Sequence, residues 1–166
     1  MYKNIFYNHK LEKVYIMIKK NNAVFILNEK IPLLEKKKFN FLIDKAKKNK
    51  NQRARYCTHK NSKKKLQEMF IVLTKNCKIK PHKHKFKEES LHVISGVADL
   101  LIYNNKGKLK KEIKLGTFSS GRNFYYRINN ESFHSLRIRS KYFVFHESTS
   151  GPFIRKNTIY PTWDVK

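Results

Sequence analysis

The chain has 166 residues, of which 40% are hydrophobic, and it contains 12 Phe and 9 Tyr. This length and composition predict one domain with a real hydrophobic core and exclude disorder throughout the chain. No apolar run is long enough for a transmembrane helix or a signal-peptide core, so we expect no membrane span and a cytoplasmic location. The two cysteines, Cys57 and Cys77, lack the spacing of a disulfide framework and fit a reducing compartment.

The formal net charge is +26, with 38 Lys and Arg against 12 Asp and Glu. Such a charge is typical of proteins that bind nucleic acid or anionic membrane surfaces. Here the charge is mostly lysine, which is spread along the whole chain beside abundant Asn and Ile, a mixture that an AT-rich coding sequence produces. We therefore favour a solvated basic surface and regard nucleic acid as an unlikely partner, whereas an anionic small molecule such as a sugar nucleotide would be attracted.

Residues 1–50 are interpreted as an N-terminal extension that holds possible strands and one helix. Short apolar clusters up to residue 30 are compatible with one or two strands added to the main sheet. Between residues 31 and 50, Phe39, Leu42, Ile43 and Ala46 recur at helical spacing with lysines on the other face. This pattern predicts one amphipathic helix of three to four turns.

Residues 51–166 are interpreted as an all-β barrel domain. Short apolar segments separated by Gly, Asn and Lys predict strands at 68–74, 77–81, 89–95, 97–103, 108–115, 123–128, 135–140 and 142–148, with a hairpin turn at 104–107. Many short strands without a long helix among them indicate an antiparallel sandwich or barrel.

The stretch "PHKHKFKEES" combines histidines, lysines and carboxylates. Strand alternation directs His82 and His84 to one face, and Glu89 is in phase with apolar residues of the next strand, so it shares their inward face. Further along, His134 is in phase with Leu136. Three histidines and a glutamate that converge inside a barrel would suit one divalent metal ion such as Fe, Mn, Ni, Co or Zn.

The alternative interpretation is that these histidines lie in a lysine-rich surface loop and that Glu89 is merely ion-paired. The glutamate, Gly96 and the third in-phase histidine favour the metal site. Glu88, of opposite phase, is predicted to be a surface partner for a lysine, and His92 is predicted to lie on the outer face.

The stretch "HKHKFKEESLHVISG" resembles the first sequence motif of the cupins, H-x-H-x4-E-x6-G. The resemblance implies a cupin-like antiparallel jelly-roll barrel whose metal is held by His82, His84, Glu89 and His134. The second motif, often P-x-G-x-x-H, departs here, since "NNESFH" has Asn129 and Glu131 in place of Pro and Gly. Asn129 and Asn130 tolerate turn conformations, so a bend before the third histidine remains feasible.

A narrower resemblance, from Phe39 to Trp163, is to the WbuC-type cupins. It is carried by "RARYCTHK", "QEMFIV", "FYYRINNESFHSL" and "HESTSGPF" in addition to the first motif. These are small metalloproteins encoded among enzymes of surface-polysaccharide and O-antigen synthesis. The resemblance implies that setting, makes a sugar-nucleotide substrate plausible, and suggests a homodimer formed through sheet surfaces.

Further polar residues are candidates for substrate chemistry. In "RARYCTHK", Arg55 can clamp a phosphate or carboxylate while His59 or Tyr56 serves as acid or base, or the stretch can be an edge strand that caps the barrel. In "HESTSGPF", His146 and Glu147 cannot both face inward; we take His146 as the substrate-binding candidate, with a closing turn as the alternative.

Cys57 is better explained as a buried structural thiol than as an extra ligand. Trp163 is expected to pack over the barrel rather than stack on a ligand.

Three functions follow from these patterns. The first is a metal-dependent enzyme that isomerises or epimerises a sugar or sugar nucleotide, with iron-dependent oxygenase chemistry as a variant. The second is a non-catalytic carbohydrate-binding or regulatory cupin with a structural metal. The third is a basic nucleic-acid-binding protein, whose affinity would fall steeply with salt.

Overall fold

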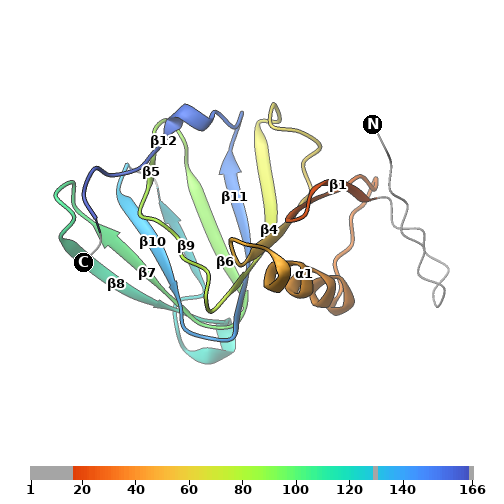
Figure 1. The fold of residues 1–166 in the computed structure, drawn as a ribbon, viewed down its shortest axis with the longest axis horizontal. Helices are drawn as coiled ribbons and strands as arrows, with labels where there is room; N and C mark the ends of the chain where they lie inside the picture. The colour runs from red at the N-terminus through yellow and green to blue at the C-terminus, as the bar shows by residue number, and fades with distance from the viewer. Residues whose placement is uncertain (1–16, 129–130, 165–166) are drawn as a thin grey trace.

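β-Strands are the predominant secondary structure, as Figure 1 shows. The computed structural model describes residues 17–128 and 131–164. Its elements are β1 (Met17–Asn21), β2 (Val24–Leu27), α1 (Lys36–Lys48), β3 (Arg53–Cys57), β4 (Leu66–Thr74), β5 (Lys83–His84), β6 (Glu89–Ser95), β7 (Ala98–Tyr103), β8 (Leu109–Leu115), the 3₁₀ turn Phe118–Ser120, β9 (Tyr125–Ile128), β10 (Phe133–Ile138), β11 (Tyr142–Ser150), the 3₁₀ turn Arg155–Asn157 and β12 (Thr158–Ile159).

Two main sheets build the barrel. The larger has the strand order β1-β2-β3-β4-β11-β6-β9 and the smaller has the order β10-β7-β8, while β12 and β5 form a short pair near one end of the barrel (Figure 1). All pairings between named strands are antiparallel except that of β2 with β3. The prediction of an antiparallel barrel with an N-terminal helix is therefore confirmed.

Strand alternation divides the larger sheet into an inner and an outer face. On β11, Phe143 and Phe145 point inward and pack in one buried cluster with Leu100 and Ile138 of the smaller sheet. Val144, between them, joins a second buried cluster beneath α1. The barrel interior and the contact with the helix are thus two separate packing layers on one sheet.

The helix α1 covers the outer face of the larger sheet. Leu42 and Ala46 are fully buried, whereas Phe39 and Ile43 pack partly buried beside them, as the helical spacing predicts. Lys45, Lys47 and Lys48 lie in the last turn, where positive charge interacts favourably with the helix dipole.

The predicted strands agree with the observed ones except at 77–81, where the chain forms no strand. The hairpin turn at 104–107 joins β7 to β8 and is closed by the Asn104 N–H donating to the Lys108 carbonyl. The segment 53–57 is not an edge strand, because β2 pairs with its other side. Residues 1–16 of the predicted extension, and the predicted turn at Asn129 and Asn130, lie outside the described residues.

The backbone at position 96, the last residue of the first motif, requires glycine. Its φ of +88° lies in the left-handed region, and a Cβ there would stand 2.1 Å from the Tyr142 carbonyl oxygen. Only glycine satisfies both conditions at this turn between β6 and β7. At the far end of the chain, Trp163 packs edge-on against Phe133 at a ring separation of 5.5 Å, in agreement with its predicted packing role.

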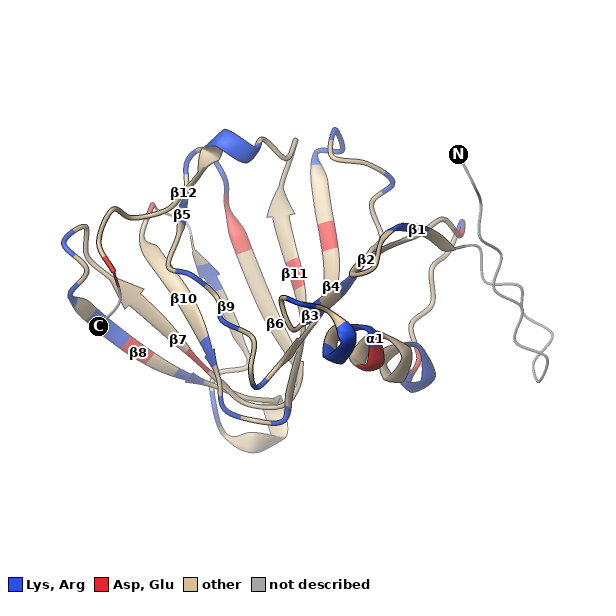
Figure 2. Cartoon of the chain, viewed as in Figure 1, with Lys and Arg blue, Asp and Glu red and all other residues tan. Residues whose placement is uncertain are grey.

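The basic residues do not gather on one element. Figure 2 shows Lys and Arg on α1, on β8 and on several connecting loops. This distribution agrees with the interpretation of a general basic surface. Among the described residues, no helix has the length and apolarity needed to cross a membrane.

Candidate metal centre and cavity

The two histidine motifs meet through a backbone bridge. The His82 N–H donates to the His134 carbonyl at 3.0 Å, and the His134 N–H donates to the His82 carbonyl at 2.9 Å. This reciprocal pair holds the two imidazole rings with their centroids 4.6 Å apart. Two residues 52 positions apart in sequence are thereby fixed side by side.

His84 and Glu89 complete the cluster. The ring of His84 lies 4.9 Å from that of His82, and ligand nitrogens of all three histidines lie within 4.8 Å of one another. Glu89, at the start of β6, places Oε2 3.2 Å from His84 Nε2 and Oε1 3.6 Å from His134 Nε2. The structure thus brings together all four residues that the sequence predicted as ligands.

Hydrogen bonds on the far side of the rings orient the cluster. His82 Nδ1 lies 2.9 Å from the Lys80 carbonyl, and His134 Nδ1 lies 3.0 Å from the Ser132 carbonyl. Because a carbonyl only accepts, both Nδ1 atoms must donate, and in the neutral rings the Nε2 lone pairs are free to bind a cation. Metal-binding histidines typically have such outer partners.

The cluster also determines its own protonation. Burial, aided by the neighbouring imidazoles, lowers the pKa of His82 to about 4. Burial would raise the pKa of Glu89, but the imidazoles of His134 and His84 outweigh it and hold that pKa well below its ordinary value. Burial would likewise lower the pKa of His134, but the Glu89 carboxylate outweighs burial and raises it. A carboxylate anion beside a neutral His82 is a donor set suited to a divalent cation.

One nitrogen of the cluster lacks a hydrogen-bond partner among the described residues. His134 Nε2 is a buried side-chain atom without a hydrogen-bond partner in the described structure, and its 3.6 Å separation from Glu89 is too long for a hydrogen bond. An unpartnered buried polar atom is costly. A divalent ion bound by His82, His84, Glu89 and His134 would remove this cost, so the residues present fit the metal that the motif implies.

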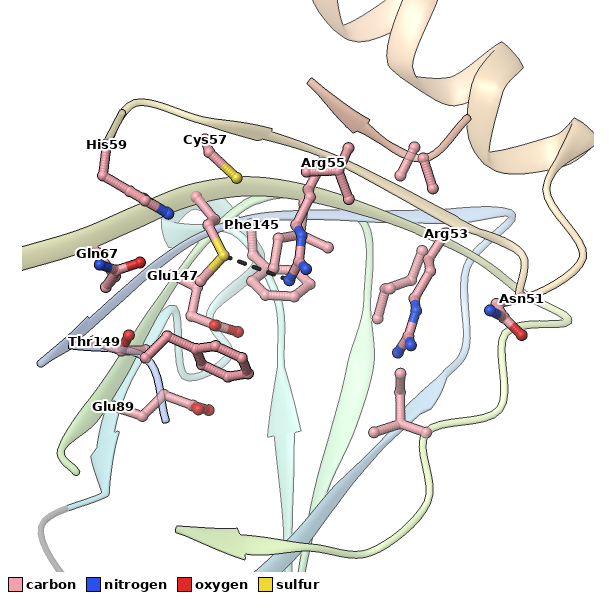
Figure 3. A pocket seen from close by; sticks show the side chains of 18 of the residues that line it. Asn51, Arg53, Arg55, Cys57, His59, Gln67, Glu89, Phe145, Glu147 and Thr149 are labelled. Carbon is pink, nitrogen blue, oxygen red and sulfur yellow. Dashed lines mark hydrogen bonds between the residues drawn. The ribbon is translucent and has the colours of Figure 1, made fainter. Parts of the chain in front are cut away.

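The cluster lies at one part of a cavity of about 890 Å³ inside the barrel. Its walls come from β3, β4, β6 and β11, and Figure 3 shows Arg53, Arg55, Glu147 and Glu89 directed into the same space. Apolar side chains such as Phe145 line the same cavity beside many polar and charged groups. A cavity of this size falls in the range of small-molecule sites.

Two of the predicted substrate residues line this cavity. Arg55 projects inward from β3 and donates to the Met69 sulfur at 3.5 Å, which is a weak bond. His59 also lines the cavity, where its Nδ1 accepts from the Glu68 N–H at 3.1 Å, and burial lowers its pKa. Cys57, on the same wall, is buried, which raises the pKa of its thiol and matches the predicted structural role.

Two others do not reach the cavity. The Tyr56 side chain points to the opposite face of β3, where its hydroxyl donates to the Lys38 carbonyl of α1 at 3.1 Å and burial raises its pKa. His146 also lies on the outer face; its ring packs on Phe70 at 4.7 Å and its Nε2 lies 3.5 Å from the Glu68 carboxylate. The structure therefore places Tyr56 and His146 away from the metal cluster.

Three further residues line the cavity that the sequence reasoning did not select as site residues. Glu147 occupies the inward position of β11 next to His146, and burial together with the charge of Glu89 raises its pKa to about 7. Tyr126 of β9 and Arg53 of β3 also line the cavity. For Arg53 the signal was present in the sequence, because it is two residues from Arg55 and shares its strand phase.

The predicted surface residues lie where expected. Glu88 is more than half exposed and forms an ion pair with Arg127 rather than with a lysine. His92 is exposed on the outer face of β6, with its ring 5.6 Å from that of Phe124.

Residues 34–115 match the model of a domain family of unknown function, DUF6016. No curated protein matches the sequence. Among solved structures, protein SO0799 from Shewanella oneidensis is similar with a TM-score of 0.52 and 10% identity, over 63% of this chain and 70% of that protein. CapF in complex with the inhibitor 3-isopropenyl-tropolone is similar with a TM-score of 0.50 and 12% identity, over 66% of this chain and 31% of CapF.

A third similar structure is that of a mutant oxalate decarboxylase from Bacillus subtilis, with a TM-score of 0.47 and 21% identity over 58% of this chain and 24% of that enzyme. The chain adopts the cupin fold. The cupin barrel explains why the two motifs meet, since its two sheets bring β10 and the segment before β5 together at the His82–His134 bridge. At these identities the likeness concerns the fold, and the chain spans only a minor part of CapF and of the decarboxylase.

Proposed function

We propose that this cupin is a metal-dependent enzyme that isomerises or epimerises a sugar or sugar nucleotide. The observation that carries the proposal is the convergence of His82, His84, Glu89 and His134 inside a cavity large enough for a small molecule, with His134 Nε2 lacking a hydrogen-bond partner in the described part of the chain. The resemblance to WbuC-type cupins supports a role in surface-polysaccharide synthesis, in the cytoplasm and as a homodimer.

The metal would be held by the three Nε2 atoms and the Glu89 carboxylate. A divalent ion at such a centre polarises a substrate carbonyl or hydroxyl as a Lewis acid. This donor set suits each of Fe, Mn, Zn, Ni and Co. The outer hydrogen bonds of His82 and His134 keep these rings in the orientation that ligation needs.

The proton transfer would be carried by groups of the cavity wall. Glu147 faces the cavity, and with a pKa near 7 its carboxyl group exists both protonated and ionised at neutral pH, as a general acid or base requires. Glu89 and Glu147 face the same cavity but have pKa values driven apart by their surroundings, a pattern found in enzymes that use one carboxyl for proton transfer. His59 is the second candidate for this role, whereas Tyr56 is too distant to take part.

The proposal is tested by proton exchange. Protein loaded with each candidate metal is incubated in D₂O with sugar nucleotides that carry a carbonyl group, and deuterium incorporation beside that carbonyl is measured by NMR. We expect incorporation with the wild type, a decrease of about 100-fold or more in Glu147→Gln, and no decrease in the matched surface variant Glu88→Gln. Binding of these compounds without incorporation would contradict catalysis and favour the non-catalytic carbohydrate-binding cupin.

A further inference from the structure

Arg53 and Arg55 form a pair on the inner face of β3. The intervening residue, Ala54, is buried beneath α1, so strand alternation directs both arginines to the cavity, where Figure 3 shows them side by side. Residues two apart on a strand are separated by about 7 Å, which lets two guanidinium groups reach one bound group. Neither arginine belongs to the predicted metal centre.

These guanidinium groups have no carboxylate partner in the described part of the chain. Three of the four arginines outside the cavity behave differently: Arg127, Arg137 and Arg139 form ion pairs with Glu88, Glu112 and Asp99. Within the described residues, no ion pair involves Arg53, Arg55 or Arg155, and these are the three arginines that line the cavity. Apart from the weak bond of Arg55 to the Met69 sulfur, no hydrogen bond from these guanidinium groups is seen in the described residues, so their donors are available to a ligand.

The wall of the cavity carries an excess of positive charge. Among the described residues, five lysines and arginines line the cavity against two carboxylates, and of these Glu89 is already engaged with the histidines. The five are Lys20, Arg53, Arg55, Lys87 and Arg155. A concave wall with an excess of one charge concentrates ligands of the opposite charge. The wall thus selects an anion, while the histidine cluster selects a metal cation.

We infer that Arg53 and Arg55 bind the phosphate or diphosphate group of a phosphorylated small molecule. Each guanidinium offers a planar fork that matches two oxygens of one phosphate, so two forks match a diphosphate or a phosphate monoester better than the single pair of oxygens of a carboxylate. The inference rests on the proposed function for one point, that the reacting end of the substrate reaches the histidine cluster. The phosphate group of the same substrate would then lie against β3.

The site is tested by isothermal titration of uridine diphosphate, glucose 1-phosphate and inorganic phosphate into the full chain. We expect the wild type to bind uridine diphosphate or glucose 1-phosphate more tightly than inorganic phosphate. Arg53→Gln and Arg55→Gln should each weaken that binding by about 10-fold or more, and the double variant by more than either. Arg137→Gln removes the same charge outside the cavity and should change the affinity less than two-fold.

Repeating the titration with His82→Ala tests whether phosphate binding depends on the metal centre. Binding that persists there but is lost in the arginine double variant supports the phosphate site even if the metal enzyme proposed above fails. Wild-type protein that binds none of the three compounds at millimolar concentration, or a folded double variant that binds them like the wild type, overturns the inference. Thermal unfolding of each variant establishes that it is folded.

Discussion

The histidines inside the barrel and those on its outer face have the same chemistry but opposite surroundings. His82 and His134 are held by a backbone bridge and have their Nδ1 atoms engaged, and His134 directs its Nε2 toward Glu89. His92 and His146 lie on the outer face, where they pack on Phe124 and Phe70. Orientation and burial, rather than the number of histidines, distinguish the candidate metal centre from the outer histidines.

Metal binding provides the largest test of this difference. A divalent ion at a free concentration 1,000 times its dissociation constant should raise the free energy of unfolding by about 4 kcal/mol. Chemical denaturation of metal-free protein, with and without added Zn²⁺ or Mn²⁺, measures this gain. The gain should disappear in His82→Ala and persist in His146→Ala. Equal gains in these two variants would mean that the inner cluster is not the site.

Glu147 gives a smaller and pH-dependent effect in metal-free protein. Its pKa is raised from 4.5 to about 7 in the folded state, so the folded protein retains a proton that the unfolded chain has lost. Glu147 therefore contributes on the order of 3 kcal/mol of stability below about pH 4.5, and this contribution falls as the pH rises and is lost above about pH 7. The change should be visible as the difference between the wild type and Glu147→Gln.

Denaturation of both proteins between pH 4 and pH 8 measures this difference. Glu88→Gln, which alters a half-exposed carboxylate on the surface, should follow the wild type throughout. A wild-type profile that stays parallel to that of Glu147→Gln would show that the Glu147 carboxyl ionises normally.

The ligand residues were predictable because the relevant information is local. His82 and His84 share a face by strand alternation, and Glu89 is in phase with the apolar residues of β6. These local patterns predict that the three side chains point into the barrel. The meeting with His134 is different, since it depends on a bridge between segments 52 positions apart. Only the resemblance to the cupin motifs predicted it.

The cavity wall was harder to predict because α1 covers the outer face of the sheet. A strand with water on one face reveals its inward side by alternation, but β3 and β11 are covered on both faces, and polar residues occur on each. Strand phase groups Arg53 with Arg55 and puts Tyr56 on the opposite face. It likewise separates Glu147 from His146, but it does not say which face looks into the cavity. That assignment required the helix position and the strand register.

The central claim is that His134, the residue with the least support from its motif, completes a metal centre. Elemental analysis of purified wild type, His134→Ala and His92→Ala tests it most directly. We expect stoichiometric divalent metal in the wild type and in His92→Ala, and loss of most of it in folded His134→Ala, because a buried ligand is removed in one variant and an exposed histidine in the other. Equal metal content in all three proteins, or no metal after loading, would contradict the claim.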